Sequence, residues 1–326
     1  MKTEAAPVLQ VRDARCVIPH PRGDIVALGG VDLTLAEGEV LGLVGESGSG
    51  KSTLAKIVIG APPPRARVSG RVTLNEVDLD EVSPRRARLL RGRHIGTVFQ
   101  DPMMALNPVV PIGRQISEGP RFLLGLSARE RRDLAVELLA QVGIPEPERR
   151  LKHYPHQFSG GMRQRITIAM ALSCSPDVLI ADEATTALDV TVQRQILDLL
   201  ADLVSRRSLA MVMVSHDLAV IAGRTHTTAV MYGGRIVEYG PTEKVFASPR
   251  HPYTRSLLAA VPRPEAGPQA RMVSIPGAPP DLAALGPGCS FAPRCELATD
   301  ECRDGFPAPR GGEHWARCVH IDERAA

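Results

Sequence analysis

Residues 40–53, VLGLVGESGSGKST, decide how the rest of this 326-residue chain is interpreted. The apolar run Val40–Val44 predicts a short buried strand, and the stretch from Lys51 to Gly60 predicts the helix after it. Glycines between them let backbone N–H groups turn toward phosphate oxygens, and the helix adds a partial positive charge. We therefore predict a phosphate-binding loop in which Lys51 contacts the β- and γ-phosphates and Ser52 binds Mg²⁺. The residues that match the pattern G-x-x-x-x-G-K-[ST] are Gly45, Glu46, Ser47, Gly48, Ser49, Gly50, Lys51, Ser52 and Thr53.

A second segment, VLIADE at residues 178–183, supplies the acids that such a loop requires. Its apolar part predicts a buried strand, and two carboxylates follow directly. A carboxylate at the end of a strand beside the loop can order Mg²⁺ through water, which is the role expected of Asp182. Glu183 is placed to polarise the attacking water as a general base.

Residues 8–260 alternate between strand and helix patterns. AMVMV at 210–214 predicts another buried strand, and apolar residues at helical spacing predict a helix over 191–205. Strands that are apolar throughout belong to a sheet covered on both faces, which indicates an α/β fold. Alternating apolar positions near the start predict antiparallel strands; they are Val11, Val31, Leu33 and Leu35.

The stretch from about 103 to 175 carries no strand pattern, and we predict an inserted helical subdomain there. Ser127-Ala128-Arg129-Glu130 has the capping-box pattern, and leucines at helical spacing follow it. The whole segment 1–260 is expected to form one nucleotide-binding domain, with residues 261–326 as an extension.

Composition restricts the class of protein. Hydrophobic residues make up 44% and charged residues 23%, which are globular values. The net charge is only +3 and aromatic residues are 3%, so we expect no nucleic-acid partner. The arginines at 85, 86, 88, 91 and 93 are interpreted as a solvated helical face. No run approaches the roughly 18 apolar residues of a membrane span, and no signal-peptide core is present, so we expect a cytosolic chain.

The composition shifts near residue 261. The last 66 residues hold ten of the 28 prolines and the single Trp, so this tail cannot be mostly regular helix or sheet. Two cysteines elsewhere, Cys16 and Cys174, are interpreted as small core residues. The tail also holds the other four cysteines, at the spacing C-x5-C-x6-C-x15-C: Cys289, Cys295, Cys302 and Cys318.

Residues 158–165, FSGGMRQR, resemble the signature sequence of the ATP-binding cassette (ABC) family, usually written Leu-Ser-Gly-Gly-Gln. Phe158 and Met162 stand where that family has Leu and Gln. Ser159, Gly160 and Gly161 match, and they open a predicted helix over 163–172 whose backbone amides can face a phosphate. In the family, that phosphate belongs to ATP held by the opposite subunit.

Three further positions resemble elements of the same family. Gln100 stands where the Q-loop glutamine senses Mg²⁺ and the transporter, Ala187-Leu188-Asp189 resembles the D-loop, and His216 follows a strand as the switch histidine does. Taken alone, Gln100 and His216 are ordinary residues, but the ordered set of six motifs supports these roles. The resemblance over about residues 8–260 implies a RecA-like α/β core, an antiparallel β subdomain and a helical subdomain.

The adenine position departs from the family pattern. The family stacks an aromatic side chain on adenine, whereas this chain has Ile25 there and no aromatic residue nearby. Ile25 can contact adenine only by apolar packing, so we predict weak discrimination between ATP and GTP.

His251-Pro252-Tyr253-Thr254 and the run Phe291-Ala292-Pro293-Arg294-Cys295 resemble elements of the dipeptide, oligopeptide and nickel importer branch of the family. Four thiolates suit a [4Fe-4S] cluster or a tetrahedral Zn²⁺. The absence of close C-x2-C knuckles, and the clusters reported for members of this branch, favour iron–sulfur; zinc and unmetallated thiols remain alternatives.

The resemblance implies an ATPase subunit that energises import of di- or oligopeptides, or of a related small solute. It implies pairing with a second ABC subunit, a paralogue in a heterodimer, and with two transmembrane permease subunits. An extracytoplasmic solute-binding protein would deliver the solute to the permease, and the chain would lie peripherally on the cytoplasmic face of the membrane. The alternative is a soluble ABC ATPase that acts on nucleic acid or ribosomes.

Overall fold

The computed structural model describes residues 7–21, 23–185, 188–261 and 275–321. The chain forms two compact units. The first unit comprises Met1–Gln10, Leu35–Glu39 and Val72–Val212, and the second comprises Val11–Thr34, Val40–Arg71 and Met213–Ala326. Ala187 of the predicted D-loop lies outside the described residues.

The second unit is built on a mixed run of strands. β3 (Val40–Val44) is buried at every position and pairs parallel with β9 (Thr227–Tyr232). β9 pairs antiparallel with β10 (Arg235–Pro241), and β10 pairs antiparallel with β11 (Trp315–Ala316). The predicted strand at 40–44 is therefore present, and α1 (Lys51–Val58) follows it as expected, although the helix ends before Gly60.

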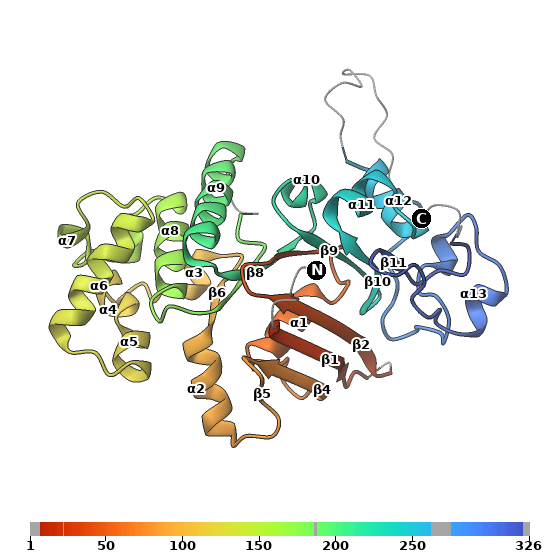
Figure 1. Ribbon diagram of the computed structural model, residues 1–326, viewed down its shortest axis with the longest axis horizontal. Coiled ribbons are helices and arrows are strands. Elements are labelled where there is room, and N and C mark those ends of the chain that lie inside the picture. Colours follow the sequence, from red (N-terminus) through yellow and green to blue (C-terminus); the bar gives the residue numbers. More distant parts are fainter. Residues whose placement is uncertain (1–6, 22, 186–187, 262–274, 322–326) are drawn as a thin grey trace, which may run out of the picture. The chain divides into compact units, whose positions relative to one another are not determined.

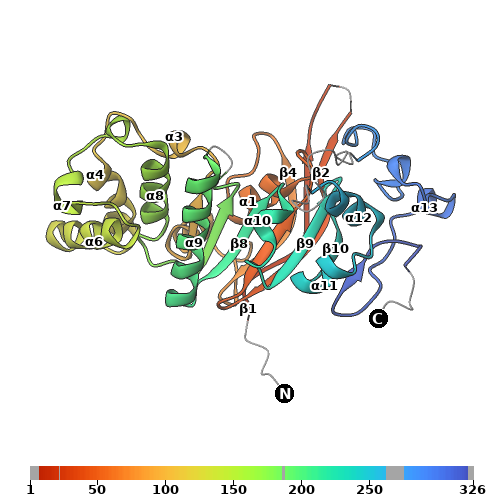
Figure 2. The same cartoon turned by 90° about the horizontal axis from the view of Figure 1, so that it is seen from above.

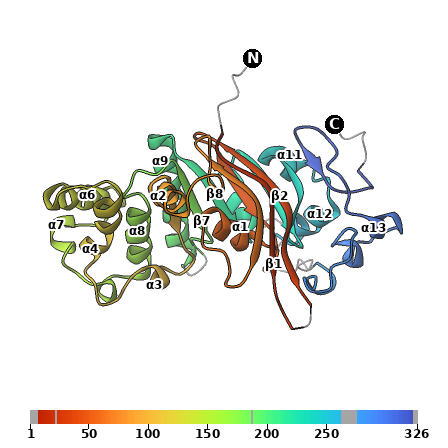
Figure 3. The ribbon, with the colours of Figure 1, turned by 90° about the horizontal axis from the view of Figure 1, so that it is seen from below.

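Helices and short segments complete this unit. α11 (Thr242–Ala247) lies beside β10 in Figure 2, and α12 (Pro252–Ala259) follows it in the chain. β1 (Pro7–Ile18) and β2 (Ile25–Ala36) are neighbouring strands that run side by side in Figure 3. The apolar residues that predicted them are at most 5% exposed, as an alternating pattern requires: Val11, Val31, Leu33 and Leu35. The remaining elements are α10 (Leu218–Ile221), η3 (Ala292–Arg294) and α13 (Glu301–Asp304).

The first unit contains a parallel pair of strands, β6 (Ile95–Val98) and β7 (Val178–Asp182). α9 (Val190–Arg207) covers the predicted 191–205, and β8 (Ala210–Ser215) covers 210–214, with the boundary between the units inside β8. β4 (Arg67–Leu74) pairs antiparallel with β5 (Val77–Asp78) at the end that belongs to this unit. α2 (Pro84–His94) buries only Ala87. Four of the five predicted arginines, at 85, 86, 88 and 93, are exposed as expected, whereas Arg91 is half-buried.

The stretch 103–175 consists of helices and loops, which Figure 1 shows gathered in the yellow and green part of the ribbon. The capping box predicted at Ser127 and Glu130 is present at the start of α6. α8 begins at Gly160, three residues before the predicted helix start, because Ser159 already caps it. The helices are α3 (Pro102–Ala105), α4 (Ile112–Ile116), α5 (Glu118–Leu123), α6 (Ala128–Gln141), α7 (Pro147–Arg150), η1 (Pro155–Gln157) and α8 (Gly160–Ala171).

The described part of the tail, 275–321, is largely irregular, as its prolines predict. It is nevertheless joined to the strands of the second unit. β11 adds to the edge of β10, and the backbone N–H of Arg317 donates to the carbonyl oxygen of Val237 at 2.7 Å. The domain boundary expected at residue 260 remains a prediction.

Candidate functional site

The loop between β3 and α1 has the backbone geometry of a phosphate cradle. Gly45, Gly48 and Gly50 have φ angles of 151°, 79° and 106°, which side chains rarely tolerate. A Cβ atom on Gly45 would lie 2.2 Å from the carbonyl oxygen of Met231. Gly50 caps α1 without a side-chain hydrogen bond, so the first N–H groups of the helix point into the loop.

Lys51 is held inside this loop. Its ammonium group donates to the carbonyl oxygens of Gly45 and Glu46 at 2.7 and 2.9 Å, and its side chain is 4% exposed. A buried cation fixed among backbone amides is an arrangement that attracts an anion as highly charged as a nucleotide phosphate. Ser52 follows Lys51 on the first turn of α1.

In the first unit, both predicted acids stand at the end of β7, and one of them contacts the predicted glutamine. Asp182 is the last residue of β7, and Glu183 follows it in the left-handed region at φ 49°. The side-chain amide nitrogen of Gln100 donates to Oε2 of Glu183 at 3.1 Å. Glu183 holds a conformation that a non-glycine residue adopts at a cost, and such strain is concentrated at functional positions.

The signature residues lie at the N-terminus of α8. The hydroxyl of Ser159 accepts a hydrogen bond from the N–H of Met162 at 3.4 Å, and Ser159 and Gly160 are exposed. A Cβ atom on Gly161 would lie 2.7 Å from Val192 on α9, so glycine is required for the packing of these two helices. Phe158 is 3% exposed and packs at 6.0 Å from the ring of His153, so the departure from Leu is absorbed in the core.

The other predicted residues divide between the units. Asp189 caps α9 by accepting from the N–H of Val192 at 3.0 Å, which gives it a structural role beside any other. His216 follows β8 in the second unit and lines a hollow of about 300 Å³ with Leu257. Ile25 is the first residue of β2 and is half-buried. The second unit therefore carries Ile25, residues 45–53 and His216; the first carries Gln100, residues 159–161, Asp182, Glu183 and Asp189.

The four tail cysteines surround one cavity of about 10 Å³, together with His251 and His320. Burial raises the pKa of Cys289 to about 11, and it also raises the pKa values of Cys295 and Cys318. These thiols are therefore protonated at neutral pH unless a cation draws off their protons. Within the described residues, no three His, Cys, Asp or Glu side chains are arranged closely enough to hold a metal ion.

His251 supplies a separate observation at this cavity. Its Nδ1 accepts from the N–H of Tyr253 at 3.1 Å, while its Nε2 is buried and has no hydrogen-bond partner among the described residues. A buried, unpaired N–H is costly, and such a group is usually satisfied by a ligand or water. Cys16 and Cys174 are buried elsewhere and behave as core residues, as predicted.

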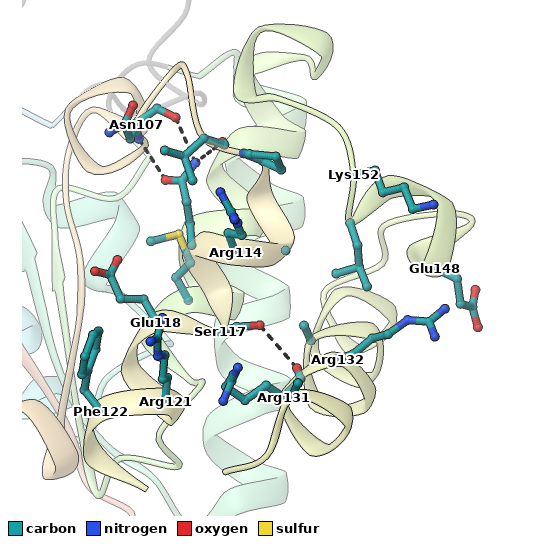
Figure 4. A pocket seen from close by; sticks show the side chains of 18 of the residues that line it. Asn107, Arg114, Ser117, Glu118, Arg121, Phe122, Arg131, Arg132, Glu148 and Lys152 are labelled. Carbon is teal, nitrogen blue, oxygen red and sulfur yellow. Dashed lines mark hydrogen bonds between the residues drawn. The ribbon is translucent and has the colours of Figure 1, made fainter. Parts of the chain in front are cut away.

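A larger cavity of about 1180 Å³ lies among the helices of the first unit (Figure 4). Ser117 donates to the carbonyl oxygen of Arg131 at 3.5 Å across part of it. Phe122 is 69% exposed. The charged side chains of the lining are mainly basic, with Arg114, Arg121, Arg131, Arg132 and Lys152 against Glu118 and Glu148. No pattern in the sequence predicts this cavity.

The α/β fold, the glycine loop with its buried lysine, and the acid-ended strand with Glu183 beside Gln100 define a P-loop nucleotide-binding protein. Residues 28–186 match the family model described as ABC transporter, and residues 237–302 match the C-terminal region of oligopeptide/dipeptide transporters. The chain belongs to the ABC transporter family, in the branch of the oligopeptide and dipeptide importers.

Similar proteins cover nearly the whole chain. A putative peptide import ATP-binding protein of Brucella melitensis is 45% identical over 98% of this chain and 99% of its own length. The oligopeptide transport ATP-binding protein OppD of Salmonella typhimurium is 46% identical over 92% of this chain and 89% of its own length. The dipeptide transport ATP-binding protein DppD of Bacillus subtilis is 43% identical over 98% of this chain and 96% of its own length.

Among solved structures, the ATP-binding cassette MJ0796, as a dimer bound to ADP and Pi, is 29% identical with a TM-score of 0.64. It covers 72% of this chain, and 98% of that structure is matched. CbiO1 of Clostridium perfringens, part of an ABC transporter complex, has a TM-score of 0.63 at 28% identity, covering 74% of this chain and 91% of its own.

Within the described residues, no helix is long and apolar enough to cross a membrane.

Proposed function

We propose that this protein is the nucleotide-binding subunit of an ABC importer, and that it hydrolyses ATP to energise uptake of di- or oligopeptides or a related small solute. The observation that carries the proposal is the loop 45–53, where three left-handed glycines and the buried Lys51 form an anion cradle. The relatives named as peptide import ATP-binding proteins supply the substrate class. They do not favour the alternative of a soluble ATPase acting on nucleic acid or ribosomes.

The residues have distinct roles in this proposal. Lys51 and the loop amides bind the β- and γ-phosphates, and His216 contacts the γ-phosphate. Glu183 takes a proton from the attacking water, and Gln100 holds the Glu183 carboxylate by the observed hydrogen bond.

The donor set also fits a magnesium ion. The Ser52 hydroxyl, the Asp182 carboxylate and the Gln100 amide are hard oxygen groups of the kind that Mg²⁺ prefers. When bound, Mg²⁺ would neutralise charge that develops on the phosphates.

We further propose that the chain pairs head-to-tail with a second ABC subunit, a paralogue in a heterodimer. Ser159 and Gly160 are exposed at the start of a 12-residue helix, so amides there can reach a phosphate held by the partner. The dimeric state named for MJ0796 supports this arrangement. We propose that Asp189, in the segment that resembles the D-loop, lies at the same interface.

Two transmembrane permease subunits are the partners expected for an ATP-binding subunit of this branch, with an extracytoplasmic solute-binding protein reached through them. We propose that the chain docks on them at the cytoplasmic face of the membrane through the surface around Gln100 and the helical subdomain. Large apolar side chains are exposed there: Phe99, Met103, Met104 and Val109 are 40%, 41%, 85% and 77% exposed. Exposed apolar groups of this kind mark a protein contact.

For the tail we propose a [4Fe-4S] cluster held by Cys289, Cys295, Cys302 and Cys318, with Zn²⁺ as the alternative. Thiol ligands suit either metal, and the unpaired Nε2 of His251 at the same cavity would donate to a metal-bound sulfur. The side chains would have to rearrange to bind it. Iron, zinc and sulfide should be assayed in preparations made with and without air. Absence of stoichiometric metal from both would remove this part of the proposal.

The catalytic assignment is tested by Glu183→Gln. The variant should lose at least about a hundredfold in ATP turnover because the general base is gone, while it still binds ATP. Glu137→Gln, at an exposed position on α6, is the matched control and should hydrolyse ATP normally. Turnover within a few-fold of wild type in Glu183→Gln would refute the role of Glu183.

A further inference from the structure

Glu46 is an acidic residue inside a loop that must attract phosphate, and the tail neutralises it. Nη1 of Arg294 donates to Oε2 of Glu46 at 2.7 Å, and Nη2 donates to Oε1 at 3.2 Å. This is the two-pronged pairing that a guanidinium makes with a carboxylate. The Arg294 side chain is 5% exposed and that of Glu46 24%, so solvent screens the pair little.

Tyr253 of α12 contacts the backbone of the loop. The N–H of Glu46 donates to the hydroxyl oxygen of Tyr253 at 2.8 Å. That N–H is therefore satisfied by protein, and the cradle for phosphate must be built from the amides that follow it. Both the side chain and the backbone of Glu46 are thus held by residues beyond position 250.

Arg294 is itself firmly placed. Its Nε donates to the carbonyl oxygen of Pro276 at 2.7 Å, and Nη1 also donates to the hydroxyl of Tyr232 at 3.1 Å. It is the last residue of η3 and directly precedes Cys295. A displacement of Cys295 therefore displaces the residue that pairs with Glu46.

A second path joins the cysteines to the loop through packed rings. Phe291, two residues after Cys289, lies 5.4 Å from Tyr253 and 5.3 Å from Tyr232 between ring centroids. Tyr232 and Tyr253 are 4.5 Å apart. All three rings are at most 2% exposed, and close-packed interiors transmit displacement because they contain little free volume.

We propose that Arg294 and Tyr253 are positioning residues for the nucleotide-binding loop, so that ATP affinity and the state of the four cysteines are thermodynamically linked. This inference rests on the proposed ATP site at residues 45–53. By reciprocity, anything that reorganises the cysteine segment changes ATP affinity, and ATP changes the accessibility of the cysteines by a related factor.

The test uses the full-length chain and a fluorescent ATP analogue. Arg294→Met should bind the analogue about tenfold more weakly, because an uncompensated Glu46 carboxylate then faces the phosphates. Arg303→Met is the control: Arg303 is a tail arginine paired with Asp300, and its side chain is 65% exposed. Arg294→Lys keeps the positive charge but not the two-pronged guanidinium, so it should lose affinity for the analogue by less than Arg294→Met does. It replaces Arg294→Met in the test if that variant does not fold.

Two further measurements separate positioning from general destabilisation. In a double-mutant cycle, Glu46→Gln should restore most of the affinity lost in Arg294→Met, because the unpaired charge is removed. A non-hydrolysable ATP analogue should slow alkylation of the tail cysteines several-fold in the wild type but not in Arg294→Met.

The outcomes are distinguishable. If the wild type binds no nucleotide, or Lys51→Ala binds it normally, the proposed ATP site fails and this inference fails with it. If the wild type binds nucleotide and both Arg294→Met and Arg294→Lys bind it as tightly as the wild type, only the inference is overturned. The same holds if the ATP analogue does not change the alkylation rate of the tail cysteines in the wild type.

Discussion

Glu238 on β10 is a fully buried carboxylate, 0% exposed, that holds three parts of the second unit together. The N–H of Arg250 and Nε2 of His314 donate to Oε1, and the N–H of His251 donates to Oε2, each at 2.8 Å. These donors come from the segment before α12 and from the tail. Glu238→Gln changes only one oxygen to an NH₂ group, so it tests this network with little change in volume.

The expected cost follows from the number of donors. A glutamine offers only one acceptor oxygen. Its NH₂ group would take the place of either Oε2, which has one N–H donor, or Oε1, which has two, and those donors would lose their acceptor. Each buried unsatisfied donor costs about 1–3 kcal/mol, and we expect a loss of about 3 kcal/mol in the free energy of unfolding. For a chain of this size that lowers Tm by roughly 4–5 °C.

Thermal unfolding followed by circular dichroism at pH 7 measures this effect. Glu243→Gln, at an exposed position on α11, is the control and should change the free energy by less than about 0.5 kcal/mol. If Glu238→Gln unfolds at the same temperature as the control, the network does not stabilise the tail, and the reasoning is refuted.

The same carboxylate contributes to acid sensitivity. Burial alone would raise the pKa of Glu238, but the hydrogen bonds from His314 and the two backbone N–H groups hold it below its ordinary value. Its contribution to stability is therefore present above the ordinary pKa of a glutamate and is lost as the pH falls through the lower, folded pKa. Glu238→Gln should lack this part of the acid dependence.

Two further predictions concern pH and nucleotide choice. Burial lowers the pKa of His251 from 6.5 to about 4, so the folded state excludes a proton that the unfolded chain binds, and stability should fall by about 3 kcal/mol between pH 6.5 and pH 4. His251→Asn, which can still cap α12, should flatten that part of the pH profile of Tm, and an unchanged profile would contradict the assignment. With Ile25 in place of an aromatic ring, ATP and GTP should be hydrolysed at similar kcat/KM; a large preference for ATP in a steady-state assay would show that adenine is recognised by other residues.

Most of the local architecture could be predicted because it depends on short-range rules. The glycines at 45, 48 and 50 occupy left-handed conformations that glycine tolerates well, and the spacing of apolar residues located β3, β7, β8, α1 and α9. The start of α8 was misplaced by three residues because glycines argue against a helix interior, whereas here they occupy its first turn behind the cap of Ser159.

Contacts between distant residues could not be predicted in the same way. Glu46 and Arg294 are 248 positions apart, and neither side chain alone indicates a partner. The only sequence signal was an acid inside an anion-binding loop, which requires a nearby cation, but many arginines could have supplied it. The addition of β11 to β10 was likewise invisible, because a two-residue strand has no periodicity.

The sequence by itself determined the class of chemistry. The phosphate loop, the acid-ended strand and the signature helix are each formed by consecutive residues, and their backbone conformations depend on those residues alone. Only the tertiary structure decided that the cysteine tail returns to the strands of the second unit, where Arg294 of the tail and Tyr253 of α12 both hold Glu46. The physical reason is that local motifs depend on φ, ψ and spacing, whereas a buried ion pair depends on how the long intervening chain closes around it.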